Sequence, residues 1–495
     1  MINSITDFLE NGIQNLIQMS ENFAQHPEEL AEYVKGIGKE TNKLALDIIG
    51  ETLTARNTMI RESSKRKEEW DIVRTDTKEL ITCLGTVQFQ KTLFRHKETG
   101  RHSYLVDQIL GFSSHQRMTE DAKERLLTEA VQTSYRKAGE ETCLNEEWVS
   151  KQTVKNVIHS LDFPEASLPK EKKVVDYLYI DADEDHIALQ FQEEKGDLTV
   201  YDSGYKDNGV LGKLVYVYEG IEKEAPESKR HRLVNRHYFS GVYEGQMNQA
   251  LWKEVERYLE MTYDLSRVKK IYLNADGGSW IKAGKSRLRG IVTVLDEFHM
   301  SKYLLKMSGH MLDEAEEVCR ELKRLIKEGT KEDFRTYTEK LASYGETENA
   351  RKRILESGQY FLNNWTAARI RLTNRKTVKG CSAEGHVSNV LSDRLSSRPM
   401  GWSEIGCDRM CKLRCYVRNH GRAKVVDLVR YRRERELQSR LKMTGTDGMV
   451  DPVERTRYTK EQREAYSYIE RLQATLGINS TVKKTLSIRE QIGNL

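Results

Sequence analysis

Two aspartates that follow apolar, β-favouring runs are the residues of this chain best suited to chemistry. Asp276 ends the run in KKIYLNADGG and precedes two glycines, and IDADEDH places Asp181 and Asp183 in a similar run. Alternate residues of a strand share one face, so Asp181 and Asp183 are predicted to point the same way. Glycines after a strand-end carboxylate let the backbone turn sharply and let another chain approach closely. Asp276 is therefore predicted to face a ligand.

A third acid lies in the stretch KGCSAEGHVSNVLSDRLSSRPMGW, where Ser382 is predicted to cap a helix and Glu384 to lie in its first turn. Three converging carboxylates repel one another, and they are stable mainly when a divalent cation neutralises them. Hard oxygen ligands favour Mg²⁺ or Mn²⁺. Two such ions about 3.5–4 Å apart clamp the attacking and leaving oxygens of a phosphodiester. Most acidic side chains are merely solvated, so the combination carries this prediction, and no single acid does.

The elements that must position these acids lie in residues 174–300. The pattern predicts strands in VVDYLYIDADEDHIALQF, KLVYVYEGIEKE and RLVNRHYFSGVY, a helix in GQMNQALWKEVERYLEMTY, and strands in VKKIYLNAD and GIVTVLDEFH. Three strands, a helix, a strand, a helix and a strand is the order of a ribonuclease-H-like fold. The predicted fold class is therefore an α/β core with a mixed five-stranded sheet, a helical insertion and helical N-terminal DNA-binding domains, mostly α overall.

The rest of the chain divides around this core, and PEASLPKEKK is the clearest linker. The predicted segments are a helical region at 1–70, a β-hairpin with a helix-turn-helix at 71–163, the core at 174–300, a helical insertion at 301–380, a basic helical segment with Glu384 at 381–440, and a tail at 441–495 with one helix at 459–475. The hairpin is predicted to turn at 96–101, among basic residues.

The helix-turn-helix prediction rests on SYRKAGEETCLNEEWVSKQTVKNVIHSL. One helix ends near Cys143, a turn occupies 144–149, and Ser150 is a suitable N-cap for the next helix. A recognition helix places its first residues in the major groove. The residues in those positions are Lys151, Gln152, Thr153 and Lys155. A helical hairpin without a DNA role is the alternative.

Charge is unevenly distributed along the chain. The net charge is only +4, but residues 365–440 hold 18 Lys and Arg against 7 Asp and Glu. Such a block favours a polyanionic partner over a solvated helical face. Within it, Arg394 and Arg398 are candidates for phosphate contacts, and Trp402 for stacking on an unpaired base, with a core position as its alternative. Cys407, Cys411 and Cys415 share one helix face and are predicted to pack.

Composition narrows the class of protein. Hydrophobic residues make up 38% of the chain, and the seven cysteines are odd in number and scattered. No apolar run reaches the roughly 18 residues of a transmembrane helix, and the first residues do not read as a signal peptide. We therefore expect a cytoplasmic, nucleoid-associated protein with reduced thiols.

Four motifs together resemble one family. YLYIDADEDHIALQ, IYLNADGGSWIKAG, VTVLDEFHMSKYL and CSAEGHVSNVLSDRLSSRPMGWSE look like the ISLre-type transposases of bacterial insertion sequences, which are also filed as a family of uncharacterised proteins. The resemblance extends to about residue 440. It implies a DDE transposase, whose ribonuclease-H-like core is interrupted by a helical insertion before the last acid. Asp276 and Glu384 lie 108 residues apart, which leaves room for that insertion.

The same resemblance implies roles for individual residues. Asp183 matches the first metal-binding acid, with Asp181 and Asp185 as rivals, Asp276 matches the second and Glu384 the third. His299 of DEFH resembles an auxiliary histidine that steadies the scissile phosphate or the strand being cut, although a packed structural histidine is the alternative.

The implied cofactor is a pair of Mg²⁺ or Mn²⁺ ions, and the implied partner is double-stranded DNA, both the terminal inverted repeats and the target. Metal-activated water would hydrolyse the transposon end, and the freed 3′-OH would then attack the target. A homodimer or larger oligomer is expected on DNA. The alternatives are a non-catalytic DNA-binding relative, which three acids disfavour, and a metal-dependent nuclease without strand transfer, which the helix-turn-helix and the insertion disfavour.

Overall fold

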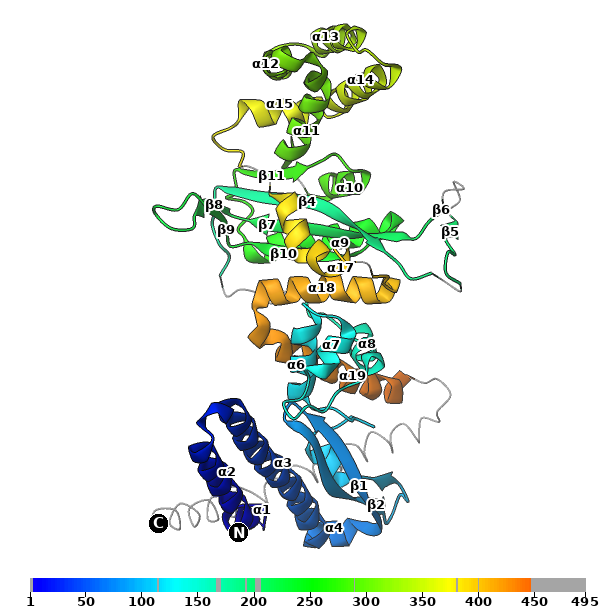
Figure 1. Ribbon diagram of the computed structural model, residues 1–495. Coiled ribbons are helices and arrows are strands. Elements are labelled where there is room, and N and C mark those ends of the chain that lie inside the picture. Colours follow the sequence, from blue (N-terminus) through cyan, green and yellow to red (C-terminus); the bar gives the residue numbers. More distant parts are fainter. Residues whose placement is uncertain are drawn as a thin grey trace. The chain divides into compact units, whose positions relative to one another are not determined.

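The strand-rich centre of the chain forms a five-stranded mixed sheet in the computed structural model (Figure 1). The strand order is β10-β7-β4-β11-β12. β7 runs antiparallel to both of its neighbours, whereas β4, β11 and β12 are parallel to one another. Their bounds are β4 Tyr177–Ala188, β7 Gly209–Tyr218, β10 His237–Val242, β11 Lys270–Ala275 and β12 Ile291–Leu295.

The structure describes residues 3–113, 115–165, 171–191, 194–200, 206–288, 290–379, 382–398 and 400–446. These residues fall into two units. One comprises residues 1–157 with those from 426 onward, and the other comprises residues 158–425. The helix predicted at 459–475 lies outside the described residues. Among the described helices, none combines the length and the apolar character needed to cross a membrane.

The two faces of the sheet differ because side chains alternate along each strand. Leu178 and Ile180 of β4 point into an apolar core with Val215 of β7 and Leu273 of β11. The opposite face carries tyrosines and acids. Tyr179 stacks there between Tyr218 and Tyr272, at centroid distances of 5.3 Å and 5.8 Å. The prediction that Asp181 and Asp183 lie on the same face of the sheet follows from this alternation.

Two helices cover the apolar face of the sheet. α9 (Asn248–Thr262) contributes Leu251, Trp252, Val255 and Leu259 to the core, and α10 (Ser279–Arg287) contributes Trp280 and Ile281. At the outer edge of the sheet, α18 (Glu404–His420) satisfies the free backbone of β10. Asn419 accepts the Tyr238 N–H and donates to the Tyr238 carbonyl, each at 2.8 Å. Cys407, Cys411 and Cys415 of α18 are buried, as predicted.

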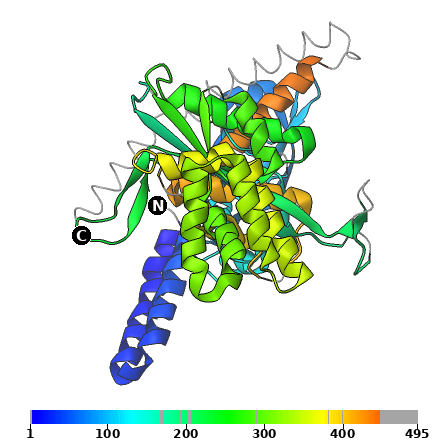
Figure 2. The same ribbon diagram turned by 90° about the horizontal axis from the view of Figure 1, so that it is seen from above.

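A bundle of helices connects β12 to the last part of the sheet unit. It consists of α11 (Glu297–Ser308), the 3₁₀ helix η4 (Gly309–Glu314), α12 (Ala315–Glu328), α13 (Lys331–Ser343), α14 (Glu348–Asn363) and α15 (Trp365–Thr373). In Figure 2 these helices, green to yellow, lie side by side. They bury a core of their own around Phe334, Phe361 and Trp365. After the bundle come α16 (Ala383–Val387), the π-helix η5 (Ser388–Ser392), α17 (Asp393–Leu395) and η6 (Arg422–Lys424).

The five predicted core strands are present in the predicted order, with one correction at the fifth. The run GIVTVLDEFH was assigned to a strand throughout, but β12 ends at Leu295 and α11 begins at Glu297. The physical reason is Asp296, whose side chain accepts the backbone N–H groups of Phe298 and His299 and so starts the helix. Short strand pairs also flank the sheet, namely β5 (Thr199–Val200) with β6 (Lys206–Asp207) and β8 (Gly220–Lys223) with β9 (His231–Val234).

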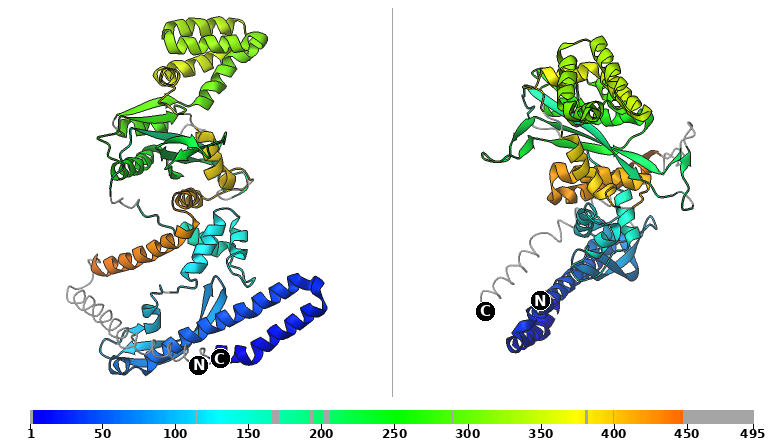
Figure 3. Two further views of the ribbon diagram at one scale, coloured as in Figure 1. Left: turned by 90° about the vertical axis from the view of Figure 1, so that its left-hand side faces the viewer. Right: turned by 45° about the horizontal axis from the view of Figure 1, so that its top comes forward.

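The N-terminal unit begins with helices and continues into a hairpin. Its first elements are α1 (Asn3–Asp7), the π-helix η1 (Phe8–Gly12), α2 (Ile13–Gln25), η2 (Pro27–Glu29), α3 (Leu30–Glu62) and α4 (Ser64–Glu69). Figure 3 shows α2 and α3 in blue as two antiparallel helices. β1 (Trp70–Thr82) then pairs with β2 (Gly85–His96). Asn57 of α3 packs on this hairpin and accepts the Thr92 N–H at 2.9 Å.

The position of the hairpin turn corrects the sequence prediction. The long hairpin turns at residues 83–84, where Thr82 Oγ1 donates to the Gly85 carbonyl at 2.8 Å. The basic stretch at 96–101 also turns, but it leads only into β3 (His102–Ser103), which pairs with the end of β2. The apolar alternation of β1 upstream of residue 78 is weak, because most of its first residues are exposed.

The second half of the N-terminal unit is helical again. It contains α5 (Leu105–Ile109), α6 (Glu120–Ala130), α7 (Tyr135–Glu140), α8 (Lys151–His159) and α19 (Val425–Thr446). The predicted segment 381–440 is therefore divided, since α16 to α18 belong to the sheet unit while α19 from residue 426 belongs to the N-terminal unit. Arg433 of α19 pairs with Glu120 of α6 within that unit.

Close packing of α10 on α9 makes a prediction about stability. A Cβ at Gly284 would lie 2.4 Å from ring atoms of Trp252, which is fully buried. Because overpacking a core typically costs about 1–3 kcal/mol, Gly284→Ala should lower the free energy of unfolding of the sheet unit by about that amount. Urea unfolding followed by circular dichroism would measure it.

Gly309→Ala is the matched control for this substitution. Gly309 has right-handed helical dihedrals, and nothing lies within 4 Å of its Cβ position. Removing backbone freedom from the unfolded chain should therefore leave stability unchanged or raise it by up to about 1 kcal/mol. Equal unfolding curves for the two variants would contradict the close contact with Trp252.

Candidate active site

The first two acids lie side by side because of strand register. β4 and β11 pair in parallel as far as Asp181 and Asn274, where β11 is about to end. Two residues further along each chain are Asp183 and Asp276. β4 continues along β7 to Ala188, with Asp183 opposite Leu214, so Asp183 stays on a rigid strand. Parallel register thus brings the two aspartates to the same edge of the sheet.

Asp276 is fixed by the turn that follows it. Its Oδ1 accepts the Gly278 N–H at 2.9 Å, and its carbonyl accepts the hydroxyl of Tyr360, from α14, at 2.7 Å. Gly277 has φ +98°, and a Cβ there would lie 2.8 Å from Oδ1 of Asn364. The glycine is needed both for the left-handed backbone and for the close approach of the insertion.

Glu384 lies in the first turn of α16 and is exposed. The segment before it is tied to the sheet. Ser382 occupies the N-cap position, but its hydroxyl lies 3.2 Å from the Tyr216 hydroxyl and makes no capping bond to the helix, which corrects the predicted cap. One turn later, His386 Nδ1 lies 2.8 Å from the Tyr238 hydroxyl. These contacts hold α16 over the polar face of β7 and β10.

The electrostatics of Asp183 link the three acids. The pKa of Asp183 is raised to about 7, chiefly by burial and then by the charges of Asp276 and Glu384, whereas the Glu184 N–H and His299 oppose the shift. The ordinary value is 3.8. The charges of Asp276, Glu384 and His299 therefore all act on Asp183, although the segments that carry them are separate in the sequence.

His299 is oriented by a neighbour that the sequence reasoning passed over. Asp296 is buried, and its Oδ2 lies 2.8 Å from His299 Nδ1. This hydrogen bond, followed by the charges of Asp276 and Asp183, raises the pKa of His299. The pairing favours the protonated ring. The Asp-x-x-His spacing was the available signal, because an N-capping Asp reaches the residue three positions later.

Asp181 and Asp185, the rivals for the first acid, have other partners. Asp181 is completely buried and accepts bonds from the Tyr216 hydroxyl at 2.7 Å and from Asn274 Nδ2 at 2.6 Å. Asp185 accepts the Ser396 hydroxyl at 2.8 Å. The charges of Asp276 and Glu384 contribute to the raised pKa of Asp183, whereas the raised pKa of Asp185 comes chiefly from its burial.

The proposed DNA-contacting residues divide into exposed and buried sets. Lys151 and Gln152 are exposed at the start of α8, with Thr153 and Lys155 partly exposed, and Arg398 is exposed as well. Arg394 and Trp402 are each 5% exposed. The Arg394 guanidinium lies 4.7 Å from the Trp402 ring, whose N–H donates to the Leu395 carbonyl at 3.0 Å. In this arrangement neither residue is available to a phosphate or a base, so Trp402 packs in the core and this part of the prediction is wrong.

Sequence reasoning also missed a buried polar connection beneath the acids. Arg371 of α15 donates to Asn274 Oδ1 at 2.6 Å and to the carbonyls of Leu295 and Lys379 at 2.9 Å and 2.7 Å. Asn274 in turn donates to Asp181. The signal available was the polar Asn274 within a largely apolar strand, because a buried polar side chain requires a partner.

The side chains around Asp183 offer oxygen donors for a divalent cation. Among the residues that the structure describes, no three His, Cys, Asp or Glu side chains form a ready-made metal cluster. Even so, Asp183 and the two acids whose charges act on it offer only carboxylate oxygens, and hard oxygen donors suit Mg²⁺ or Mn²⁺. The raised pKa of Asp183 shows the unfavourable charge that such a cation would relieve.

Comparison with known proteins establishes the family. The profile of an uncharacterised protein family, UPF0236, matches residues 24–432. The chain belongs to the UPF0236 family. Two UPF0236 proteins of Caldanaerobacter subterraneus subsp. tengcongensis are each 33% identical to it, one over 418 residues (84% of both chains) and one over 424 residues (85% of this chain and 86% of the relative).

A solved structure, the Drosophila P element transposase strand transfer complex, aligns with 73% of this UPF0236 chain and 93% of its own at 10% identity. Its TM-score is 0.21, which is too low to establish a shared fold.

The shifted pKa of Asp183 predicts a pH-dependent stability. Because its pKa in the folded chain, about 7, lies above 3.8, the folded state retains a proton that the unfolded state loses between these values, and stability falls as pH rises through that window. Asp183→Asn keeps the oxygen that accepts the Glu184 N–H and removes the charge. Without divalent cations, the variant should be about 1–3 kcal/mol more stable than the wild type at pH 8.

Urea unfolding in a chelator at pH 8 and pH 4.5 would test this, with Asp313→Asn, an exposed acid of η4, as the control. The advantage of Asp183→Asn should shrink at pH 4.5, where the wild type is protonated too. Adding Mn²⁺ at pH 8 should stabilise the wild type more than the variant. A variant that is less stable than the wild type at pH 8 in chelator would show that Asp183 does not carry the unfavourable charge.

Proposed function

We propose that this chain is a DNA transposase that performs metal-dependent phosphodiester hydrolysis and strand transfer at the ends of an insertion sequence. The observation that carries the proposal is the raised pKa of Asp183, on which the charges of Asp276, Glu384 and His299 all act, together with the β4–β11 register that ends two residues before Asp183 and Asp276. Such a group of acids suits an enzyme that acts on phosphodiesters through divalent cations.

The sheet topology supports a ribonuclease-H-like core. The strand order has β4 central, β7 and β10 to one side and β11 and β12 to the other, with only β7 reversed. Helices follow β10 and β11, as the predicted element order requires. In this interpretation the helical bundle from α11 to α15 is the insertion that precedes the last acid.

The names of the relatives give independent support. One of the Caldanaerobacter UPF0236 proteins carries eleven numbered designations from one strain in its name, and another carries four. We interpret each designation as a separate locus encoding the same protein. Many copies in one genome are what a mobile element produces, and they are unusual for a housekeeping enzyme or a repressor. We therefore extend the proposal of mobility to this chain.

The chemistry follows from what each side chain does. Asp183, Asp276 and Glu384 would hold two Mg²⁺ or Mn²⁺ ions, which when bound would activate water and stabilise the charge of the reacting phosphate. Tyr360 and Gly278 hold Asp276 in place, and the contacts of Ser382 and His386 hold the segment of Glu384.

His299, oriented by Asp296, would in its protonated form donate a hydrogen bond to a non-bridging oxygen of the scissile phosphate. After cleavage, the 3′-OH of the transposon end would occupy the position of the nucleophile and attack target DNA.

DNA binding is proposed for the exposed residues of several helices. The exposed side of α11 presents Phe298, Lys302 and Lys306 near His299 in the chain, which suits the DNA flanking the cleaved bond. α7 and α8 would serve as a helix-turn-helix for the terminal repeats. Action on paired ends requires at least a dimer, and exposed apolar residues on the N-terminal helices, Leu30 and Val34 among them, would suit that contact.

A metal-dependent nuclease without strand transfer is the second candidate, because its core chemistry would be identical.

Removing one acid should separate catalysis from binding. Asp276→Asn retains the oxygen that accepts the Gly278 N–H, so the turn should persist, but the loss of a charged ligand should lower cleavage at least about a hundredfold. The measurement is cleavage of a labelled duplex carrying the element's own end in Mn²⁺, with binding followed by fluorescence anisotropy.

Asp313→Asn is the control, as an exposed acid outside the site. Binding of Asp276→Asn should stay within about threefold of the wild type, since no phosphate contact is lost. Undiminished cleavage by this variant would remove Asp276 from the catalytic group. Joining of the cleaved end to a second DNA would distinguish a transposase from the nuclease alternative.

DNA affinity should fall steeply with salt, because phosphate contacts release counterions. A protein that neutralises six to ten phosphates loses about 10³–10⁵ in affinity between 50 and 200 mM salt. Arg375 and Lys376 are exposed in the turn beside Thr377, whose carbonyl accepts the Tyr179 hydroxyl at 2.6 Å. Replacing both with alanine should reduce the slope of log affinity against log salt by about 1–2.

The matched control replaces Lys35 and Lys39, which are exposed on α3, with alanine. Their loss should leave the salt slope unchanged within error. A flat salt response of the wild type would contradict a DNA-binding role for the basic segment, and an equal change in both double variants would contradict a specific role for Arg375 and Lys376.

A further inference from the structure

One tryptophan of this chain is exposed, and the other five are not. Trp148 is 71% exposed. Trp70, Trp252, Trp280, Trp365 and Trp402 are all between 0% and 7% exposed. A single exposed apolar residue is ordinary, but tryptophan is among the residue types enriched at the energetic centres of binding sites, so its surroundings decide its role. Nothing in the proposed catalytic site uses Trp148, which belongs to the N-terminal unit.

The backbone around Trp148 is held on both sides. The Val149 N–H donates to the Gly139 carbonyl at 3.0 Å, and Gly139 leaves no room for a side chain, since a Cβ there would lie 2.0 Å from the Val149 carbonyl oxygen. On the other side, the Glu147 carboxylate accepts the Thr86 N–H at 2.8 Å. The indole is therefore presented by a fixed loop, which lowers the entropy cost of binding.

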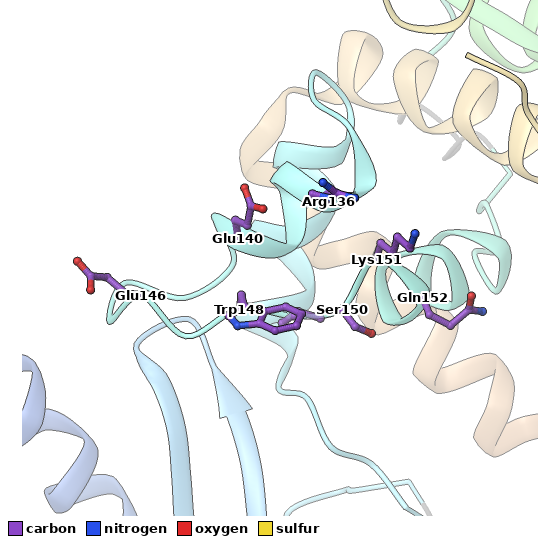
Figure 4. A pocket seen from close by; sticks show the side chains of 8 residues that line it. Arg136, Glu140, Glu146, Trp148, Ser150, Lys151 and Gln152 are labelled. Atoms are coloured by element: carbon purple, nitrogen blue, oxygen red, sulfur yellow. The ribbon is translucent and has the colours of Figure 1, made fainter. Parts of the chain in front are cut away.

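Trp148 borders a cavity of ≈ 580 Å³ between α7 and the start of α8. Figure 4 shows its lining, with Arg136 and Glu140 from α7, and Lys151 and Gln152 from α8. The volume lies in the range of about 300–1,000 Å³ that is usual for small-ligand sites. The lining thus combines one flat aromatic ring with two cations, an amide and the two carboxylates of Glu140 and Glu146.

We propose that this cavity binds one unstacked nucleobase of DNA, with Trp148 stacking on the base. The proposal rests on the DNA-binding function proposed above and specifies what the N-terminal unit recognises. An indole stacks well on any base, and the contact is favourable only when the base is out of the duplex. Gln152 and Glu140 can pair with the donors and acceptors of a base edge, while Arg136 and Lys151 suit the phosphates on either side.

The surroundings favour a nucleotide over a protein segment. Leu144 is the one other large apolar residue of the loop that is exposed, at 55%, and it does not line the cavity. A protein partner would require a wider apolar surface around the tryptophan. Instead, the exposed positions at the start of α8 are the cation Lys151 and the amide Gln152, and the base-stacking ring lies directly before them in the chain.

The test compares two single-stranded probes of equal charge, a 15-nucleotide oligothymidine and a 15-unit abasic phosphodiester chain without bases. The full-length protein should bind the oligothymidine about tenfold or more tightly than the abasic chain, as expected from one stacked base. Trp148→Ala should bind the two probes equally, and Trp148→Phe should retain most of the preference. Leu144→Ala is the matched control and should behave as the wild type.

Acrylamide quenching gives a second measurement on the same protein, because only Trp148 is accessible to the quencher. Saturating oligothymidine should protect the quenchable fluorescence, the abasic chain should not, and Trp148→Ala should lack that fraction. A preference for oligothymidine that survives in Trp148→Ala, or quenching that oligothymidine leaves unchanged, would overturn the proposal.

Binding to a duplex that carries the element's end should be measured in parallel. It distinguishes failure of the base-binding proposal from failure of the proposed transposase function. Duplex binding by both the wild type and Trp148→Ala, without any base preference, would reject the base pocket and leave the transposase proposal intact. Failure of the wild type to bind either the duplex or the single strands would reject both proposals.

Discussion

The geometry of the site depends on satisfying the buried carboxylate of Asp181. A carboxylate that is completely buried costs several kcal/mol unless hydrogen bonds compensate for the lost water. Its partners come from different parts of the chain, with Tyr216 and Tyr218 on β7 and Asn274 on β11. The Ser382 N–H, 3.4 Å away, adds the segment before α16. The carboxylate is satisfied only when the elements that carry all three catalytic candidates are assembled, so the fold and the site form together.

The same network explains why the helical bundle is more than an attachment to the sheet. Arg371 brings a buried guanidinium from α15 to Asn274, and it also binds the carbonyl at the end of β12. Tyr360 of α14 binds the carbonyl of Asp276. The chain therefore leaves the sheet at β12, builds a core of its own, and returns through two contacts that fix the acid-bearing turn. Disorder in the bundle would loosen Asp276 as directly as a change in the turn itself.

Strand periodicity was enough to predict the five core strands and the face that carries the acids, because alternation along a strand is a local property. It could not choose among Asp181, Asp183 and Asp185, which all point the same way. That choice depends on where β11 ends. Asp181 is still paired with Asn274 of β11 and is buried, whereas Asp183 lies just beyond the part of β4 that pairs with β11. The position of Trp402 could not be decided for a similar reason. Its residue type suits nucleic-acid stacking, but only tertiary packing against Arg394 and Leu395 shows that it is buried.

The contrast between the two neighbouring aspartates bears on the choice between an enzyme and a DNA-binding protein without chemistry. Asp181 has its charge compensated by the protein, whereas Asp183 has a raised pKa and faces two further acids. A surface evolved only to hold DNA would place cations there, since uncompensated acids repel phosphates. Under the proposed function, a divalent cation bound with the substrate would offset both the burial of Asp183 and its repulsion by the two nearby acids. The raised pKa of Asp183 therefore supports the proposed catalytic role over a role in DNA binding alone.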